Sequence, residues 1–358
     1  MNILFIVPYP HGKAPSQRFR YEQYLEFLKD KKWHYTLAPF LDNNTWSILY
    51  KPGFVSQKVF GIILGFLKRF ILLFSVYKYD YVFIHREATP IGPPWFEWLV
   101  SKVLRKKIIY DFDDAIWIPN TSATNKIVAH IKWHSKVASI CKWAFKVSCG
   151  NAYLQEFACQ FNPNVTLNPT TIDTEHLHNL NLFTPLTKTN SKPIIGWTGT
   201  HSTLQYLEPL VLIIQKLEQQ HSFEFCIIAN KSPDWNIKSL NFVQWNKETE
   251  IQDLARFDIG LMPLTDDKWA KGKCGFKALQ YMALEIPAIV SQIGVNTEIV
   301  DDGKNGFVCS NISEWENAIS LLLKDHARRE NMGKEARGKI IREFSVVGNT
   351  ENFISLFK

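Results

Sequence analysis

The chain has 358 residues, of which 46% are hydrophobic and 21% are charged. This composition excludes a disordered protein, and the length predicts two domains. The net charge of +7 favours an anionic partner such as a nucleotide, a phosphorylated lipid or an acidic membrane surface. There is no zinc-finger spacing and no RNA-binding aromatic motif, so we expect no nucleic-acid partner. The six cysteines form no C-x-x-C pair, which predicts reduced thiols in a cytoplasm and neither disulfides nor a cysteine metal site.

Short apolar runs alternate with helical patterns in the first half of the chain. We predict strands at residues 3–7, 35–39, 81–85, 107–110 and 145–149, and helices at 17–29 and 95–104. The first run is cut short by Pro8 and lacks a basic leader, so it indicates a buried strand and not a signal peptide. The alternation is typical of a parallel sheet covered by helices.

A second series of the same kind follows a polar stretch at residues 185–193, where we place a linker. We predict its strands at 194–198, 223–228, 259–262 and 288–291, with a helix at 277–283. The predicted domains are therefore residues 1–187 and 188–335, each of ordinary domain size. Residues 336–358 are predicted to be helical and to pack back toward the first domain.

The most hydrophobic segment lies between residues 54 and 77. Lys68 and Arg69 sit in its middle, where charges are costly in a bilayer, so it is not expected to span one. Its surplus apolar surface belongs in the core, in a dimer contact or at a bilayer interface. Because the chain is basic, we predict the bilayer interface, with Lys58, Lys68 and Arg69 attracted to anionic lipid.

Charged residues follow two strands of the first series, at the ends where open α/β sheets bind ligands. Asp113 and Asp114 follow the strand at 107–110, and Glu87 follows the strand at 81–85. We predict these three as catalytic-site residues and expect one aspartate to raise the pKa of its neighbour. Helix capping by the aspartates and a surface pair of Arg86 with Glu87 are the alternatives.

The acceptor or cleft side of the same site is predicted to hold four further residues. Gly12 and Arg18 lie in the loop and helix start after the first strand, and His85 and Arg86 close the strand at 81–85. For Gly12 and Arg18 the alternative is an ordinary connecting loop.

Two turns of the second series predict anion binding. The strand at 194–198 runs into Gly199 and Thr200, small residues that let backbone N–H groups approach an anion. Residues 271–277 place three lysines and two glycines at the start of an apolar helix, although lysines ordinarily favour a helix C-terminus. This arrangement suits neutralisation of a diphosphate, and a solvated basic turn is the alternative. The binding residues predicted in these turns are Gly199, Thr200, Lys273, Cys274, Gly275, Phe276 and Lys277.

Residues 257–264, 286–291, 294–300 and 302–307 resemble the donor half of family 4 glycosyltransferases, and Gly333 and Arg337 resemble that family's closing helices. The resemblance implies an α/β protein with the GT-B fold, in which two Rossmann-like, doubly wound domains face each other across a cleft. It covers nearly the whole chain and is most specific in the second half.

The resemblance also implies an activity. We expect retaining, metal-independent transfer from a nucleotide-diphosphate sugar of the UDP or GDP type to a glycan or lipid-linked acceptor, without a cofactor. The expected setting is synthesis of a cell-surface polysaccharide or lipopolysaccharide, in the cytoplasm and peripherally on the inner face of the cell membrane. A nucleotide-sugar epimerase and a catalytically silent homologue acting as a binding partner are the alternatives.

The chain departs from the family pattern at defined positions. The two glutamates of the family's E-x7-E motif fall on Gly272 and Gln280, whereas Glu298 matches the glutamate of its P-E-I-V element. The resemblance therefore implies that Glu298 and Gln280 bind the donor, Gln280 through an amide that can hydrogen-bond ribose hydroxyls. Trp197 stands about where the family has a cation that clamps the pyrophosphate, so we infer that Lys273 or Lys277 supplies the charge. The family's His-Asp pair corresponds to Asp113 and Asp114, which the resemblance places near the reacting sugar. Retaining enzymes of this fold are thought to use the leaving phosphate as the base, so neither aspartate is expected to be a nucleophile.

Overall fold

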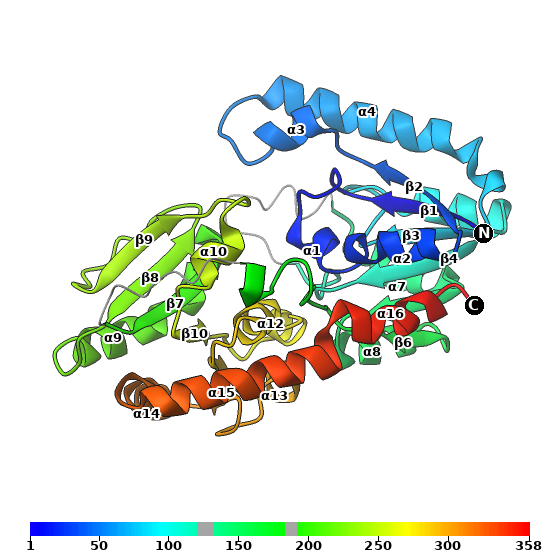
Figure 1. The fold of residues 1–358 in the computed structure, drawn as a ribbon. Helices are drawn as coiled ribbons and strands as arrows, with labels where there is room; N and C mark the ends of the chain where they lie inside the picture. The colour runs from blue at the N-terminus through cyan, green and yellow to red at the C-terminus, as the bar shows by residue number, and fades with distance from the viewer. Residues whose placement is uncertain (120–131, 183–191) are drawn as a thin grey trace. The chain divides into compact units, whose positions relative to one another are not determined.

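A computed structural model describes residues 1–119, 132–182 and 192–358. It divides into two compact units (Figure 1). The first unit comprises Met1–Thr170, Gly272–Cys274 and Asn349–Lys358, and the second comprises Thr171–Lys271 and Gly275–Gly348. Most of the predicted linker at residues 185–193, and the boundary predicted between 187 and 188, lie outside the described residues.

The first unit is built on a six-stranded parallel sheet with the order β2-β1-β3-β4-β5-β6. Its strands are β1 (Asn2–Val7), β2 (His34–Pro39), β3 (Tyr81–His85), β4 (Lys107–Phe112), β5 (Lys146–Cys149) and β6 (Val165–Leu167). Its helices are α1 (Pro15–Arg18), α2 (Leu25–Asp30), α3 (Asn43–Ile48), α4 (Val55–Leu73), α5 (Trp95–Trp98), α7 (Lys136–Trp143) and α8 (Ala152–Cys159). Short 3-10 or π turns cover Glu22–Tyr24, Val76–Lys78 and Leu99–Val103.

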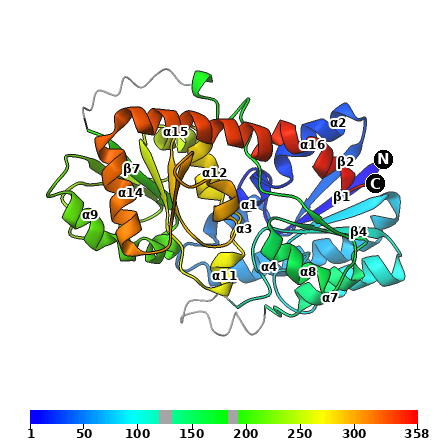
Figure 2. The same ribbon diagram turned by 90° about the horizontal axis from the view of Figure 1, so that it is seen from below.

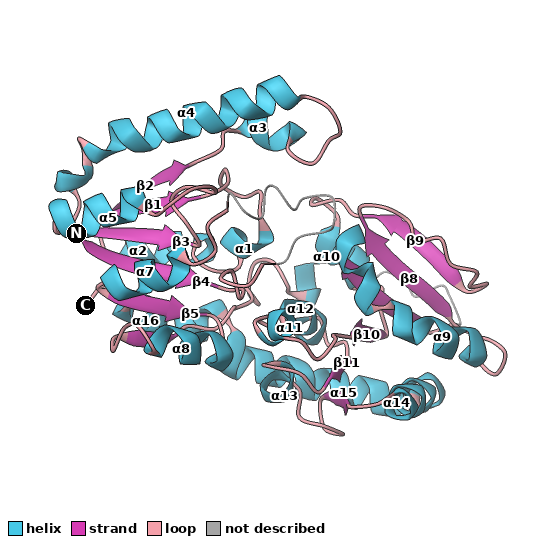
Figure 3. Cartoon of the chain, turned by 180° about the vertical axis from the view of Figure 1, so that it is seen from behind, coloured by secondary structure: helices cyan, strands magenta, loops and turns pink. Residues whose placement is uncertain are grey.

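The second unit has its own six-stranded parallel sheet, in the order β12-β11-β10-β7-β8-β9 (Figure 3). Its strands are β7 (Ile194–Gly199), β8 (Glu224–Ala229), β9 (Leu240–Gln244), β10 (Ile259–Met262), β11 (Ala288–Ser291) and β12 (Gly306–Cys309). Its helices are α9 (Val211–Leu217), α10 (Glu250–Leu254), α11 (Lys268–Lys271), α12 (Phe276–Ala283), α13 (Asn296–Ile299), α14 (Ile312–Lys324) and α15 (His326–Lys339), and α16 (Val346–Ser355) runs into the first unit. Short 3-10 or π turns cover Leu180–Leu182, His201–Tyr206, Glu208–Leu210 and Ile340–Phe344.

Both strand orders are doubly wound, so each sheet has a switch point where the order reverses. It lies between β1 and β3 in the first sheet and between β7 and β10 in the second. The predicted class, an α/β protein with two Rossmann-like sheets, is confirmed. In such sheets ligands bind outside the carboxyl ends of the strands at the switch point, which directs attention to the residues after Val7, His85, Gly199 and Met262.

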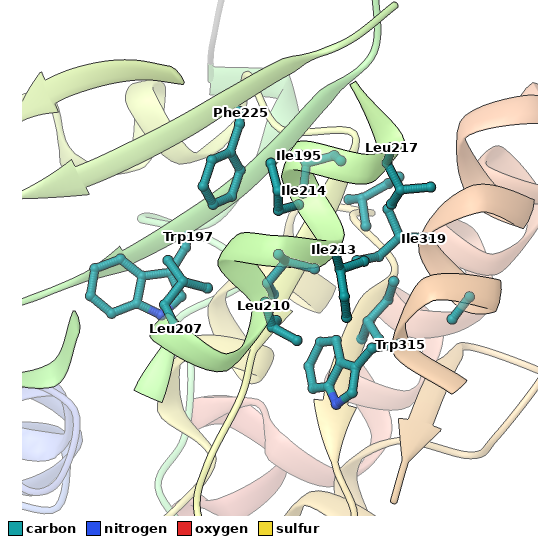
Figure 4. Packing of buried hydrophobic residues seen from close by; sticks show 14 of the residues in the cluster. Ile195, Trp197, Leu207, Leu210, Ile213, Ile214, Leu217, Phe225, Trp315 and Ile319 are labelled. Atoms are coloured by element: carbon teal, nitrogen blue, oxygen red, sulfur yellow. The ribbon is translucent and has the colours of Figure 1, made fainter. Parts of the chain in front are cut away.

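Each unit buries its own core. In the second unit Ile213 and Leu217 of α9 pack against Trp315 and Ile319 of α14 over the face of the sheet, as Figure 4 shows. On the opposite face α12 lies beside α15 (Figure 2), as the right-handed crossovers of the fold require. In the first unit the C-terminal segment completes the core, where Phe353 stacks on Tyr24 with ring centroids 4.4 Å apart.

Two predicted helices differ from the structure in instructive ways. The helix predicted at 17–29 is interrupted between α1 and α2, where Arg20 turns into the first unit to reach Asp111. The helix predicted at 95–104 begins as α5 and continues as a π-turn. A long-range ion pair therefore overrides the helical pattern in the first case.

The long helix α4 has an unusual inner side. Its buried residues are Gly61, Gly65 and Arg69, while its large apolar side chains are exposed on the opposite side. This outer face of α4 consists of Val55, Val59, Phe60, Ile63, Leu67, Phe70 and Ile71, each at least half exposed. The outer face therefore does not belong to the core, which removes one of the three places expected for its surplus apolar surface.

Candidate functional site

The carboxyl ends of three neighbouring strands in the first sheet carry a buried polar network. Strand register pairs His85 of β3 with Asp111 of β4, and Asp111 with Ser148 of β5. His85 Nδ1 lies 2.8 Å from Asp111 Oδ2, Ser148 Oγ donates to Asp111 Oδ1 over 2.6 Å, and Arg20 forms a fully buried ion pair with Asp111. Burial alone would raise the pKa of Asp111, but the charge of Arg20 and the contact with His85 hold it well below its usual range.

Next to this network, at the switch point, Arg86 joins the two predicted aspartates. Its Nε donates to Asp113 Oδ1 over 2.8 Å, and its Nη2 donates to Asp114 Oδ2 over 2.6 Å. Lys273 Nζ lies 2.9 Å from the other oxygen of Asp114. We call Arg86, Asp113, Asp114 and Lys273 the charge cluster. Arg86 has a φ of 61°, a left-handed conformation that strains a residue with a side chain and that is common at functional sites.

The pKa of Asp114 is lowered, not raised. Burial opposes ionisation, but Lys273 and Arg86 together outweigh it. The expectation that one aspartate would raise the pKa of the other is therefore wrong for Asp114. Two cations, Arg86 and Lys273, contact its carboxylate oxygens, and nothing in the sequence indicated these contacts. Asp114 is an ionised hydrogen-bond acceptor at neutral pH.

Glu87 takes a different partner from the surface pair considered above. Its carboxylate lies 2.7 Å from the ammonium group of Lys136 on α7, and Arg86 turns to the aspartates instead. His85 is buried within the network on Asp111. Of the two cleft residues predicted at the end of β3, His85 and Arg86, it is therefore Arg86 that joins the charge cluster.

The loop after β1 holds the other two predicted cleft residues. Gly12 has a φ of 72°, and its N–H donates to Glu22 Oε2 over 2.9 Å. The Arg18 guanidinium lies over the ring of Phe19 at 5.0 Å from its centroid. The side chain that turns inward from this loop is Gln17, which is fully buried and bonds both backbone polar groups of Tyr9.

The segment Gly272–Cys274 belongs to the first unit. A Cβ at Gly272 would lie 2.6 Å from the Cβ of Ala115 and 2.8 Å from its backbone nitrogen. The Cys274 thiol donates to the carbonyl of Asp113 over 3.1 Å, and Asn151 Nδ2 donates to the Lys273 carbonyl over 2.9 Å. Lys273 and Cys274 thus belong to the first unit, whereas the other predicted anion-binding residues belong to the second.

Those other residues follow β7 and begin α12. Thr200 caps the 3-10 turn after β7 through a reciprocal pair of hydrogen bonds with Thr203. Gly199 lies against the ring of Trp197, and Lys277 Nζ sits 5.5 Å from the centroid of the same indole. Lys277 and Gly199 therefore both lie next to Trp197, at the carboxyl end of β7, one of the two strands that border the switch point.

The start of α12 requires glycine. Gly275 caps the helix with a φ of 68°, and Ile299 fills the space a Cβ would occupy. Phe276 is the first residue of the helix. Further along, Gln280 is buried, with Nε2 3.5 Å from His178 Nε2, whereas Glu298 lies exposed on α13. Gln280 and Glu298 therefore differ sharply in their access to solvent.

Sequence reasoning missed several polar residues of the first-unit site. Arg20 and Asp111 form its buried support, Lys136 pairs with Glu87, and Tyr9 lies beside Arg86 at the end of β1. Asp111 had a readable signal, because it opens the D-x-D-D run after an apolar strand. Arg20 and Lys136 had none, since their partners lie far away in the chain.

Two general searches complete the description. Within residues 1–119, 132–182 and 192–358, no group of three or more His, Cys, Asp or Glu side chains is arranged to hold a metal ion. In that same part of the chain, no helix has both the length and the apolar character needed to cross a membrane.

Comparison with known proteins finds a family match in the second half of the chain. Residues 192–325 match the family model described as glycosyl transferases group 1. The chain is 31% identical to spore coat protein SA of Bacillus subtilis over 80 residues, 22% of this chain and 21% of that protein. It is 27% identical to N-acetyl-alpha-D-glucosaminyl L-malate synthase of Bacillus anthracis over 124 residues, 34% of this chain and 31% of that one. The matches thus span less than a third of either relative.

Solved structures establish the fold over the whole length. Sucrose-phosphate synthase from Thermosynechococcus elongatus superimposes with a TM-score of 0.71 at 14% identity, covering 99% of this chain and 98% of that one. HepE from Anabaena, in complex with UDP-glucose, gives a TM-score of 0.67 at 15% identity with the same coverage. The chain therefore has the GT-B fold. The match of residues 192–325 to glycosyl transferases group 1 confirms the predicted resemblance to a glycosyltransferase family.

Proposed function

We propose that this chain, whose residues 192–325 match glycosyl transferases group 1, is a retaining, metal-independent glycosyltransferase. It moves a sugar from a nucleotide-diphosphate sugar to a glycan or lipid-linked acceptor. The family match carries the proposal. The complex of HepE with UDP-glucose supports a donor of the UDP type, and the charge cluster at the first switch point supplies groups suited to sugar hydroxyls.

The charge cluster supports a role in orienting the reacting sugar. Asp114 is held ionised by Lys273 and Arg86, so its oxygens accept hydrogen bonds from hydroxyl groups and do not donate them. We assign Asp113 and Asp114 to positioning, with Arg86 fixing both carboxylates, and neither to nucleophilic attack. The leaving phosphate then serves as the base for the acceptor, in keeping with a retaining reaction.

We further assign the diphosphate to the lysines of the α12 turn. Lys277 lies over Trp197 beside Gly199, at the carboxyl end of β7 where doubly wound sheets bind ligands. Lys273 carries the second charge and is partnered by Asp114. A charged hydrogen bond from either ammonium group to a phosphate oxygen stabilises the bound nucleotide.

Alanine at Lys273 or at Lys277 is expected to weaken binding of the nucleoside diphosphate by about 1.5–3 kcal/mol, the usual strength of a charged hydrogen bond. Isothermal titration calorimetry measures the change. Lys271→Ala is the matched control, because Lys271 lies in the same turn but forms an exposed pair with Asp266. Unchanged affinity in both test variants would remove the lysines from the diphosphate site.

Activity is expected to survive EDTA. A metal-binding D-x-D would need Asp111 and Asp113 to face one ion, but Asp111 faces Arg20 and His85, while Asp113 accepts from Arg86. Cations of the protein already compensate both charges. Release of nucleoside diphosphate from the donor, measured with EDTA and with added manganese, should be equal within twofold. Complete loss in EDTA with recovery in manganese contradicts the proposal.

A catalytically silent binding protein is the second candidate, and one observation favours it. Ala115 leaves no room for a side chain at Gly272, and Gln280 is buried beside His178, so the two positions of the family's carboxylates hold none. Nucleotide-sugar binding without any turnover, including slow hydrolysis in the absence of acceptor, would decide for this candidate.

A thermal-shift screen of UDP-, GDP-, ADP- and dTDP-sugars identifies the donor, because a ligand at ~100 times its Kd adds about 2.7 kcal/mol of stability.

We place the protein in the cytoplasm, peripherally on the inner face of the cell membrane, in synthesis of a surface polysaccharide or lipopolysaccharide. The net charge of +7 and the exposed apolar side chains of α4 support this location, because an anionic membrane presents lipid-linked acceptors to a basic protein.

A further inference from the structure

Helix α4 is fixed in the first unit by its least hydrophobic side. Gly61 packs on Thr45 and Gly65 on the ring of Phe40, so closely that a Cβ at either position would overlap these side chains. Arg69 is buried and donates from Nε to the Ala88 carbonyl over 2.8 Å, and from Nη2 to the Val7 carbonyl over 3.0 Å. The helix cannot turn over without breaking these contacts, so its apolar side is held outward.

The outer face of α4 is large enough to require an explanation. The helix has 19 residues and is therefore about 28 Å long at 1.5 Å per residue, with exposed apolar side chains along its length. Figure 1 shows it on the outer side of the first unit, next to α3. Monomeric soluble proteins rarely expose a continuous apolar surface of this kind, which marks an interaction site.

The charges around α4 indicate the partner. Residues 43–79 contain no Asp or Glu, and their lysines at 51, 58, 68 and 78 flank the outer face and all retain contact with solvent. Asp42, just before this range, interacts with Lys68. A second copy packing on this face would bring two basic segments without a carboxylate close together, which is unfavourable. An anionic lipid surface instead pairs the lysines with headgroups while the apolar side chains enter the acyl boundary.

We propose that the outer face of α4 binds an anionic lipid bilayer, with the helix lying in the plane of the membrane. The helix is preformed and docks as a rigid element, so binding requires no folding step. Arg69 has no part in lipid contact, which corrects the expectation drawn from its sequence position: its guanidinium is sealed inside by α4 itself. Lys58 and Lys68 keep the role expected of them.

Arg69 also connects α4 to the candidate site through its two hydrogen bonds. Val7 ends β1, and Ala88 follows Arg86 and Glu87 beyond β3, so Arg69 bridges the two sides of the switch point. A bilayer bound to α4 would therefore lie against the element that holds this end of the sheet. The link between the bilayer and the candidate site rests on the proposed function, because it matters only for a lipid-linked acceptor. Lipid binding by α4 does not depend on the proposed function.

Cosedimentation of the full chain with vesicles tests the proposal. At low salt we expect binding to phosphatidylcholine vesicles that contain phosphatidylglycerol and little binding to phosphatidylcholine alone, with loss at high salt. Leu67→Glu with Phe70→Glu should weaken binding at least about tenfold, since both side chains lie on the outer face. Lys58→Gln and Lys68→Gln should each weaken it about fivefold.

Two controls make the result specific. Leu212→Glu with Ile312→Glu changes two exposed apolar residues of the second unit and should leave vesicle binding unaltered. Nucleotide affinity and the thermal midpoint, measured for every variant, should stay at the wild-type values, which separates a failed lipid site from misfolding and from a failed donor site. The proposal is overturned if the wild-type chain does not sediment with anionic vesicles, or if it forms a dimer that Leu67→Glu with Phe70→Glu dissociates.

Discussion

Replacing Asp111 with Asn is expected to lower the free energy of unfolding by about 3–5 kcal/mol, the usual cost of removing one partner of a buried ion pair. Asp111 and Arg20 are both fully buried, and when the carboxylate is gone Arg20 keeps its hydrogen bond to the neutral Asn168 carbonyl and loses its direct ion pair. The desolvated guanidinium is then uncompensated. Guanidinium chloride denaturation, with an unchanged slope, measures the loss.

A surface pair provides the comparison for this variant. Glu26 and Lys29 form an exposed pair one helical turn apart, and Glu26→Gln should leave the denaturation midpoint nearly unchanged, because solvent screens the pair. If Asp111→Asn costs as little as Glu26→Gln, the buried network does not stabilise the first unit.

The pH dependence of the same variant follows from the depressed pKa of Asp111. A carboxyl group whose pKa is lower in the folded than in the unfolded protein stabilises the fold at pH values above its unfolded pKa, which is about 3.9 for Asp. This stabilisation is lost as the pH falls toward the folded pKa. Acidification below about pH 4 should therefore destabilise the wild-type protein more than Asp111→Asn. The difference in stability between the two proteins should narrow as the pH falls.

The central strands were the part of the fold most readily predicted. β3, β10 and β11 match the predicted ranges to the residue, and each is buried along its whole length. The strands that were missed, β6, β9 and β12, all lie at sheet edges. Because an edge strand is half exposed, it mixes polar and apolar residues and lacks the continuous apolar run on which the predictions depended.

Helix α4 shows where composition misleads. The sequence predicted a segment with surplus apolar surface and placed Arg69 on the outside, against anionic lipid. The spacing of Gly61, Gly65 and Arg69 at every fourth residue marks one face, and that face is the buried one. Which side of a helix faces inward depends on what it packs against, here Thr45 and Phe40.

The candidate site was predicted in part. Charged residues after β3 and β4 were readable, because the carboxyl ends of parallel strands share one edge of a sheet. The ion pair of Asp114 with Lys273 was not, since 159 residues separate them. Arg20 likewise reaches Asp111 across 91 residues. Such contacts depend on the completed tertiary structure and leave no periodic trace in the sequence.

Replacing Arg86 with Ala is expected to reduce donor turnover about 100-fold, the scale of effect found when reacting groups are displaced by about 1 Å. Arg86 is the residue that binds both Asp113 and Asp114, so its loss leaves Asp113 without this partner and Asp114 with Lys273. Arg86→Lys keeps the charge but not the two-pronged geometry, and should fall between Arg86→Ala and the wild type. Initial rates of nucleoside diphosphate release give the comparison.

The pH profile distinguishes this role from simple support of the fold. Burial raises the pKa of Asp114 while Lys273 and Arg86 lower it, so removing Arg86 must move that pKa upward. Asp114 then protonates at higher pH, and the acid limb of the rate profile should shift to higher pH in Arg86→Ala. Arg86→Gly should show the same shift and the same loss of rate, yet be more stable than Arg86→Ala by about 1 kcal/mol, because glycine tolerates the φ of 61°. Full activity with an unmoved acid limb in both variants would leave Arg86 as a structural residue, and the charge cluster would have no part in the reaction.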